Sequence, residues 1–159
     1  MMKKLLVAGS LALVATTAAF AGTPTTPGAN GTGGKALVAK LSGASEVPAA
    51  TAADRGSAVI RLNAKTLKVC WSFSSLKLTA KPGLGKTPLA AHIHVGAAGA
   101  TGAVVVPLGA SYARSGCTTS TKPVIDAILA NPKGYYVNVH NASYPDGAVR
   151  GQLKKGTPA

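Results

Sequence analysis

All three histidines of the chain fall in two segments that alternate like β-strands, with His92 and His94 in one and His140 in the other. Residues two apart in a strand point to the same side of a sheet, so His92 and His94 share a face. Tyr136, Asn138 and His140 share a face in the second segment for the same reason. If the two strands are neighbours, every imidazole lies on one side of one sheet. A metal site or a polar binding surface could form there.

Three imidazoles on one face can supply three nitrogen ligands to copper or zinc, at about 2.0–2.1 Å from the metal. The three histidines are therefore the candidate metal ligands. Glu46 could add a carboxylate oxygen, and Arg150 could pair with Glu46 or with an anionic ligand. We group Glu46, Asn138 and Arg150 as candidate supporting or ligand-binding residues. The alternative is that the histidines only hydrogen-bond to backbone and to neighbouring side chains.

The N-terminus has the pattern of a bacterial signal peptide. Two lysines at positions 3 and 4 precede an uncharged apolar stretch, and Ala19-Phe20-Ala21 has the small-x-small form of a cleavage site. The apolar stretch is too short for a comfortable membrane span, and no cysteine at the cleavage point indicates a lipid anchor. We expect residues 1–21 to be removed. The mature protein is then expected to be secreted, periplasmic or on the cell surface, with no membrane span.

Composition divides the rest of the chain into three parts. Residues 22–34 are rich in Gly, Pro and Thr and contain no large apolar residue, which indicates a flexible leader. Residues 35–155 have the length of one domain with one core. Residues 156–159 form a short tail. The sequence therefore predicts a single folded domain.

Cys70 and Cys117 are the only cysteines. In an exported chain an isolated pair predicts one disulfide. A metal or catalytic thiol site is the competing interpretation. We rank it lower because oxidising compartments consume free thiols and neither cysteine lies near a histidine in the sequence.

The chain is strongly basic, with 17 Lys and Arg residues against 4 Asp and Glu. Loss of residues 1–21 would leave 15 basic and 4 acidic residues, a net charge of +11. Such a charge attracts polyanions, so an anionic cell-surface polymer is one candidate partner and another extracellular protein is a second. The alternative is that the lysines serve only solubility. No nucleic acid is expected as a partner, because no basic run is interleaved with aromatic residues.

Alternation of apolar and polar residues predicts eight short strands: 36–42, 57–63, 67–73, 76–80, 89–95, 103–108, 135–140 and 148–153. Turn residues at 53–56, 81–83, 96–99 and 144–147 separate them. Residues 121–132 predict one helix, with Pro123 in its first turn and Pro132 at its end. The fold class expected is therefore all-β, a Greek-key sandwich or barrel with one short helix and one disulfide.

Six separate pieces of the sequence, in chain order, are informative together: Leu41-Ser42-Gly43-Ala44-Ser45-Glu46-Val47-Pro48, Gly56-Ser57-Ala58, Ala91-His92-Ile93-His94-Val95-Gly96 with Gly99 and Gly102, Asn131-Pro132, Tyr135-Tyr136-Val137-Asn138-Val139-His140 and Pro145-Asp146-Gly147-Ala148-Val149-Arg150-Gly151-Gln152-Leu153. Together they resemble the chordin-domain (CHRD) family over nearly the whole expected domain. The resemblance implies a secreted, immunoglobulin-like Greek-key fold. It implies no established reaction and no defined ligand residues.

The segment with His92 and His94 is also similar to the His-x-His strand of copper–zinc superoxide dismutases. A dinuclear copper–zinc site needs roughly twice the histidines that this chain has, so dismutase chemistry of that kind is excluded by composition. A single metal is not excluded. No Gly-x-Ser-x-Gly motif occurs, and the few carboxylates argue against a paired-acid hydrolase.

Three hypotheses of function follow. The first is a non-enzymatic exported module for binding or surface association, with no cofactor. The second is a mononuclear copper or zinc protein centred on His92, His94 and His140. The third is a cationic protein that binds acidic extracellular polymers.

Overall fold

The computed structural model describes residues 33–157. Nine strands form in chain order: β1 (Lys35–Ser42), β2 (Arg55–Asn63), β3 (Lys68–Lys77), β4 (Pro88–Val95), β5 (Val104–Pro107), β6 (Ser115–Thr119), β7 (Tyr135–Asn141), β8 (Tyr144–Gln152) and β9 (Lys154–Lys155). One helix, α1 (Lys122–Ala130), and two short 3₁₀ turns, η1 (Gly43–Ser45) and η2 (Pro132–Gly134), complete the fold.

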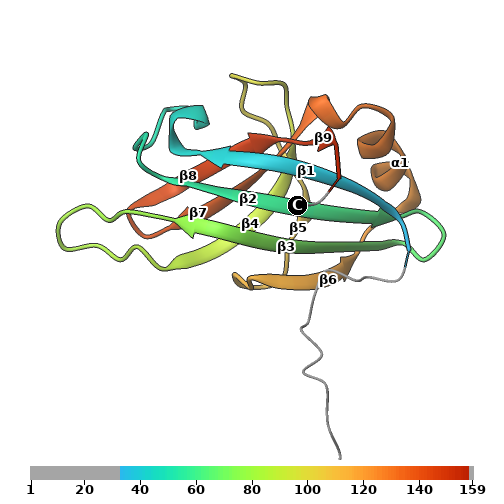
Figure 1. Cartoon of the computed structure of the whole chain (residues 1–159), viewed down its shortest axis with the longest axis horizontal. Coiled ribbons are helices and arrows are strands. Elements are labelled where there is room, and N and C mark those ends of the chain that lie inside the picture. Colours follow the sequence, from blue (N-terminus) through green and yellow to red (C-terminus); the bar gives the residue numbers. More distant parts are fainter. Residues whose placement is uncertain (1–32, 158–159) are drawn as a thin grey trace, which may run out of the picture.

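The strands make one antiparallel sheet in the order β5-β4-β7-β8-β1-β2-β3-β6, and β9 adds to β1. The sheet bends back on itself into a nearly closed barrel (Figure 1). The prediction of an all-β fold with one short helix and one disulfide is confirmed.

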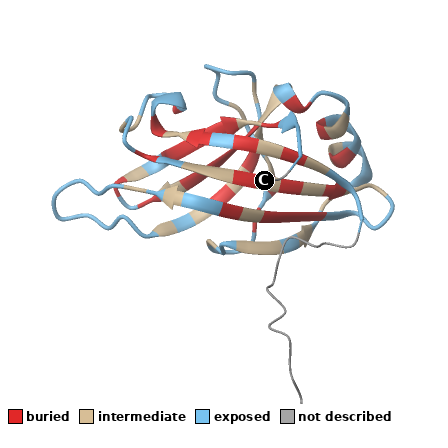
Figure 2. Cartoon of the chain, in the orientation of Figure 1, coloured by how far each residue is buried: buried red, intermediate tan, exposed pale blue. Residues whose placement is uncertain are grey.

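The core lies between the two halves of the bent sheet. Leu37, Ile60 and Trp71 project into it from β1, β2 and β3, while Ile93 and Val137 project from β4 and β7. Each is at most 3% exposed, and buried and less buried residues alternate along β1 and β2, as Figure 2 shows. Removing these side chains from water stabilises the fold, and it directs the opposite face of β1 and β2 outward, whereas β7 and β8 are buried on both faces over most of their length.

The helix α1 lies at one end of the barrel (Figure 1). Pro123 stands at its start, where a missing backbone N–H costs nothing, and Ile125 and Ile128 are fully buried. The turn η2 follows at once and begins at Pro132. The helix therefore lies inside the predicted range and packs against the core through Ile125 and Ile128.

The predicted disulfide is present between Cys70 of β3 and Cys117 of β6. The two residues are directly opposite each other in the β3–β6 ladder, with 4.0 Å between their Cα atoms. No free cysteine occurs in residues 33–157. The thiol-site interpretation is therefore wrong for this structure.

Several predicted boundaries were wrong. The segments 67–73 and 76–80 form one strand that ends at Lys77, and a positive φ of 51° at Ser75 explains the broken alternation. The predicted turn 144–147 lies inside β8, because the chain turns earlier, where Asn141 Oδ1 accepts a hydrogen bond from Tyr144 N. Strands β6 and β9 were missed, because each is short and has no apolar alternation of its own.

The predicted signal peptide and most of the predicted leader lie outside the described residues. Within residues 33–157, no helix is both long enough and apolar enough to span a membrane.

Candidate functional site

The two histidine-bearing strands are neighbours. β4 pairs with β7 in antiparallel register, which places His92 opposite Asn138 and His94 opposite Tyr136. Residues that face each other across an antiparallel ladder have side chains in contact range on the same face. Ile93 and Val137 point into the core, so the histidines stand on the outer face of the sheet.

The three imidazoles converge. One ring nitrogen from each of His92, His94 and His140 lies within 4.8 Å of the other two. His92 Nδ1 and His140 Nε2 are 3.0 Å apart, and the ring centroids of these two residues are 4.9 Å apart. All three side chains are partly exposed, so the cluster is open to solvent.

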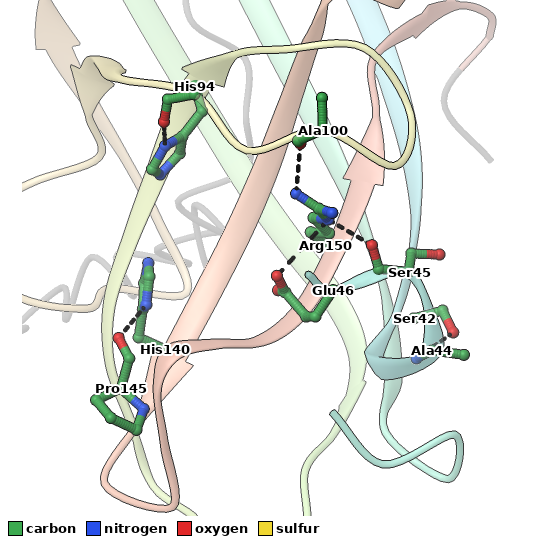
Figure 3. A network of polar contacts seen from close by, with 10 residues as sticks. Ser42, Ala44, Ser45, Glu46, His94, Ala100, His140, Pro145 and Arg150 are labelled. Atoms are coloured by element: carbon green, nitrogen blue, oxygen red, sulfur yellow. Dashed lines mark hydrogen bonds and ion pairs between the residues drawn. The ribbon is translucent and has the colours of Figure 1, made fainter. Parts of the chain in front are cut away.

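Backbone carbonyls fix which nitrogens of the cluster are free. His94 Nδ1 donates to Gly102 O over 2.9 Å, and His140 Nδ1 donates to Pro145 O over 2.8 Å (Figure 3). In a neutral imidazole that donates through Nδ1, Nε2 carries the lone pair. His94 Nε2 is buried and has no hydrogen-bond partner among residues 33–157. Of the two Nε2 atoms, that of His94 is therefore free to bind an electron-pair acceptor, whereas that of His140 is an acceptor already engaged by His92.

The third candidate ligand atom of the cluster is His92 Nδ1. Because His140 Nε2 accepts, His92 Nδ1 is the donor of the bond between them. A cation that took the place of this proton would find the lone pairs of both nitrogens facing it. His92 would then carry its proton on Nε2.

Burial and neighbouring rings favour the neutral form of His92. Its pKa is lowered to about 4, most of all by burial and then by the neighbouring His140 and His94. Burial also lowers the pKa of His140, although the bond to Pro145 and the nearby Asp146 act in the opposite direction. Neutral imidazole is the form that binds metals, so His92 and His140 are in the binding form at neutral pH.

An aromatic ring joins the histidine cluster to a buried ion pair. The rings of Tyr136 and His94 are stacked, with centroids 4.9 Å apart and planes 9° apart. On the same Tyr136 ring lies the Arg150 guanidinium, 4.7 Å from its centroid. Tyr136 is 3% exposed, so the histidine and the arginine both pack against a buried ring.

Arg150 and Glu46 form the buried pair. Arg150 Nε lies 3.7 Å from Glu46 Oε2, and both side chains are 4% exposed (Figure 3). Arg150 Nε also donates to Ser45 O, and its Nη1 donates to Ala100 O over 2.9 Å. Burial raises the pKa of Glu46 to about 7, against the opposing effect of Arg150.

Unpartnered polar atoms concentrate in this region. Six buried side-chain nitrogen or oxygen atoms of residues 33–157 have no hydrogen-bond partner, and four of them belong to His94, Asn138, Arg150 and Glu46. Native structures leave few such atoms without a partner, because each one costs desolvation energy. Their concentration marks this face as the place where a ligand would be accommodated.

A family model for the CHRD domain matches residues 37–153 of this chain. The chain belongs to the CHRD-domain family. No curated protein and no solved structure matches it. All the histidines of this CHRD domain, together with Glu46, Asn138 and Arg150, lie within the matched residues.

The CHRD domain brings the candidate residues together in two groups. The three histidines form one, and Glu46 and Arg150 form the other. Asn138 lies between the groups by register, opposite His92 on one side and opposite Arg150 on the other. The suggestion that Glu46 supplies a metal ligand finds no support in this geometry, because Glu46 is absent from the cluster of converging ligand atoms.

Sequence reasoning missed the groups that orient the candidate residues. Gly102 and Pro145 contribute only backbone carbonyl oxygens. Every residue has such an oxygen, so the residue type does not indicate which one accepts from a histidine. Tyr136 was placed on the correct face, but its ring contacts were not foreseen. Gly102 did carry a signal. A Cβ there would lie 1.6 Å from Val95 O, so only glycine allows the approach.

Proposed function

We propose that this protein is an exported, non-enzymatic CHRD-domain module whose ligand is one copper or zinc ion, bound by His92, His94 and His140. The observation that carries the proposal is the convergence of three ring nitrogens, two of which are fixed as acceptors by carbonyls on the far side of their rings. Export is supported by the signal-peptide pattern and by the disulfide, which is a feature of oxidising compartments.

The donor set suits a transition metal. The ligand atoms would be His92 Nδ1, His94 Nε2 and His140 Nε2. Metal-binding histidines typically donate their other ring N–H to a carbonyl or carboxylate, which fixes the ring and strengthens the ligand. His94 and His140 both have that arrangement already, with Gly102 and Pro145 as acceptors.

The spacing favours copper over zinc. Two nitrogens bound at about 2.0–2.1 Å lie about 2.9 Å apart in square-planar coordination and about 3.3 Å apart in tetrahedral coordination. His92 Nδ1 and His140 Nε2 are 3.0 Å apart. Nitrogen sites also bind Cu²⁺ more tightly than Zn²⁺ in general. The widest nitrogen pair of the cluster, within 4.8 Å, would have to close to about 4 Å or less.

Calorimetric titration of the untagged mature protein with Cu²⁺ and with Zn²⁺ tests the proposal. We expect one ion per chain, with copper bound more tightly. A paramagnetic resonance spectrum of the copper form should show coupling to imidazole nitrogen. His94→Ala should weaken copper binding by more than the roughly 10–100-fold typical for loss of a supporting group.

Tyr136→Phe is the matched control, because it keeps the ring against His94 and removes only a hydroxyl outside the ligand set. This variant should bind copper like the parent. Stoichiometric binding that survives in His94→Ala, or no binding by the parent protein, would contradict the proposal.

A further inference from the structure

A pocket of about 280 Å³ opens beside the Glu46–Arg150 pair, away from the histidine ligand atoms. Its walls come from the η1 segment, the loop between β4 and β5, and the end of β8. Glu46 and Arg150 line it together with Gln152, while Ala98 and Gly99 form part of its rim. None of the three histidines lines this pocket. It is therefore a site distinct from the proposed metal centre.

Each of the two charged groups at this pocket has one buried atom without a hydrogen-bond partner in the described part of the chain. Glu46 is 6% exposed and Arg150 is 3% exposed, yet Glu46 Oε1 and Arg150 Nη2 have no hydrogen-bond partner among residues 33–157. Figure 3 shows the two side chains approaching each other, Glu46 from the position just after η1 and Arg150 from β8. Leaving a buried charged group without a hydrogen bond is costly, so both atoms would gain from a ligand that satisfies them.

The chemistry of these atoms defines the ligand class. A guanidinium only donates hydrogen bonds, an ionised carboxylate only accepts them, and a hydroxyl group does both. Gln152 uses its amide nitrogen on the carbonyls of Gly96, Lys133 and Tyr135, which leaves its side-chain oxygen as a further acceptor. Adjacent hydroxyls can accept from Arg150 and donate to Glu46 and Gln152.

Charged ligands fit this pocket less well. A carboxylate or phosphate on the ligand would pair with Arg150 but would be repelled by the neighbouring Glu46 carboxylate. An ammonium group would be repelled by Arg150 in the same way. The pair is neutral as a unit when Glu46 is ionised, so a neutral ligand avoids both repulsions. The small volume admits a single ring, since sites for drug-sized ligands span about 300–1,000 Å³.

We propose that this pocket binds one neutral sugar unit through hydroxyl groups held by Glu46, Arg150 and Gln152. The small side chains at its rim, Ala98 and Gly99, leave space for the carbon face of the ring. This site requires no metal, so it stands whether or not the histidine cluster binds copper.

Amide NMR spectra of the metal-free mature protein, titrated with glucose, galactose, mannose and N-acetylglucosamine, test the proposal. A millimolar dissociation constant is expected for a ligand of this size, so each sugar is added to about ten times that concentration. At least one sugar should shift the amides of Gly99 and Gly151 in a saturable manner. The amides of the histidine strands should move less.

The blocking variant leaves the buried pair intact. Ala98 is exposed and lines the pocket, so Ala98→Trp should fill the mouth and abolish the saturable shifts. Ala97→Trp is the matched control, because Ala97 is an exposed neighbour that does not line the pocket. It should leave binding unchanged.

Three results would overturn the proposal. The first is no saturable shift with any of the sugars, which would leave solvent as the occupant. The second is binding that Ala98→Trp does not weaken. The third is binding of glucuronate or glucose 6-phosphate that is at least tenfold tighter than binding of every neutral sugar.

Discussion

His92 and His140 are 48 residues apart in the sequence, yet His92 Nδ1 and His140 Nε2 lie 3.0 Å apart. The bond joins two side chains that would both carry positive charge at low pH. Protonation of both rings would place an N–H on each of the two facing nitrogens and break this contact. The cluster therefore connects stability to pH, and with it the affinity of the proposed metal site.

Acidification should release copper only well below the ordinary range of imidazole. Metal ions compete with protons for the same nitrogens, and the pKa values of His92 and His140 are both lowered, that of His92 to about 4. We expect half of the copper to be lost at a pH below 6.5, the reference pKa of histidine. Copper absorbance followed during a pH titration measures this. Release centred above pH 6.5 would contradict the neutral-cluster interpretation.

The metal-free protein should also lose stability as the pH falls from 6.5 to about 4. A histidine with a lowered pKa is protonated more readily in the unfolded chain, so its contribution to stability is present above pH 6.5 and lost below. We expect a decrease of about 1–3 kcal/mol, since His92 is partly exposed. Urea unfolding across this range measures it, and His92→Asn should show a smaller decrease.

Glu46 should impose the opposite pH dependence. Its pKa is raised to about 7, so the folded protein takes up a proton more readily than the unfolded chain, and the stability from this group is lost as the pH rises from 4.5 to 7. Glu46→Gln removes the titration. The free energy of unfolding of the variant relative to the parent should increase by about 1–3 kcal/mol between pH 5 and pH 8. A constant difference across this range would contradict the raised pKa.

Gly102 should behave as a metal-site residue although it has no side chain. A Cβ at this position would collide with Val95 O, so Gly102→Ala must displace the loop and with it the carbonyl that orients His94. We expect copper affinity to fall by about 10–100-fold. Gly85→Ala is the control, because a Cβ there meets no atom within 4 Å. Equal copper affinity in both variants would show that the carbonyl does not matter.

Loss of the disulfide should lower stability by up to about 4 kcal/mol, because the bond closes a loop with a sequence separation of 47 residues. Urea unfolding of the double variant Cys70→Ser, Cys117→Ser, compared with that of the parent, measures this loss in the free energy of unfolding. Thiol titration of the denatured, unreduced protein should find no reactive thiol. Two thiols per chain in freshly exported protein would contradict the disulfide.

The net charge of +11 expected after removal of residues 1–21 predicts that any binding to an acidic polymer weakens steeply with salt. Of the four acidic residues, Glu46 and Asp54 are buried, so they contribute little to the outer surface. Retention on an anionic polysaccharide column should decrease as salt rises, while an uncharged matrix should not retain the protein. Salt-independent retention would leave solubility as the role of the lysines.

The sequence predicted most of the fold because strand alternation is local. The positions of His92 and His94 on one face follow from a period of two, and the same holds for Tyr136 and His140. The convergence of the two strands was a conditional prediction, since nothing local specifies which strands pair. The structure satisfies that condition through the β4–β7 ladder.

The rest of the site depends on long-range packing. The carbonyls of Gly102 and Pro145 reach the histidines only because the loops that carry them fold back over the sheet. Gln152 was not singled out from the sequence, because its side chain is held in place by hydrogen bonds from its amide nitrogen to the carbonyls of Gly96 and Lys133, which are distant in the sequence. Residues that no sequence motif marks can therefore become orienting or ligand-binding groups through the tertiary fold alone.

The order of the strands leaves the sheet with two ends, β5 and β6. A free sheet edge can add a strand from another molecule, and this is a common route to aggregation. The Cys70–Cys117 bond attaches the end strand β6 to β3. In a reducing environment β6 could detach and leave the edge of β3, with Val69 and Trp71 beneath it, open to a second chain. The oxidising compartment expected for this protein therefore also protects it from self-association.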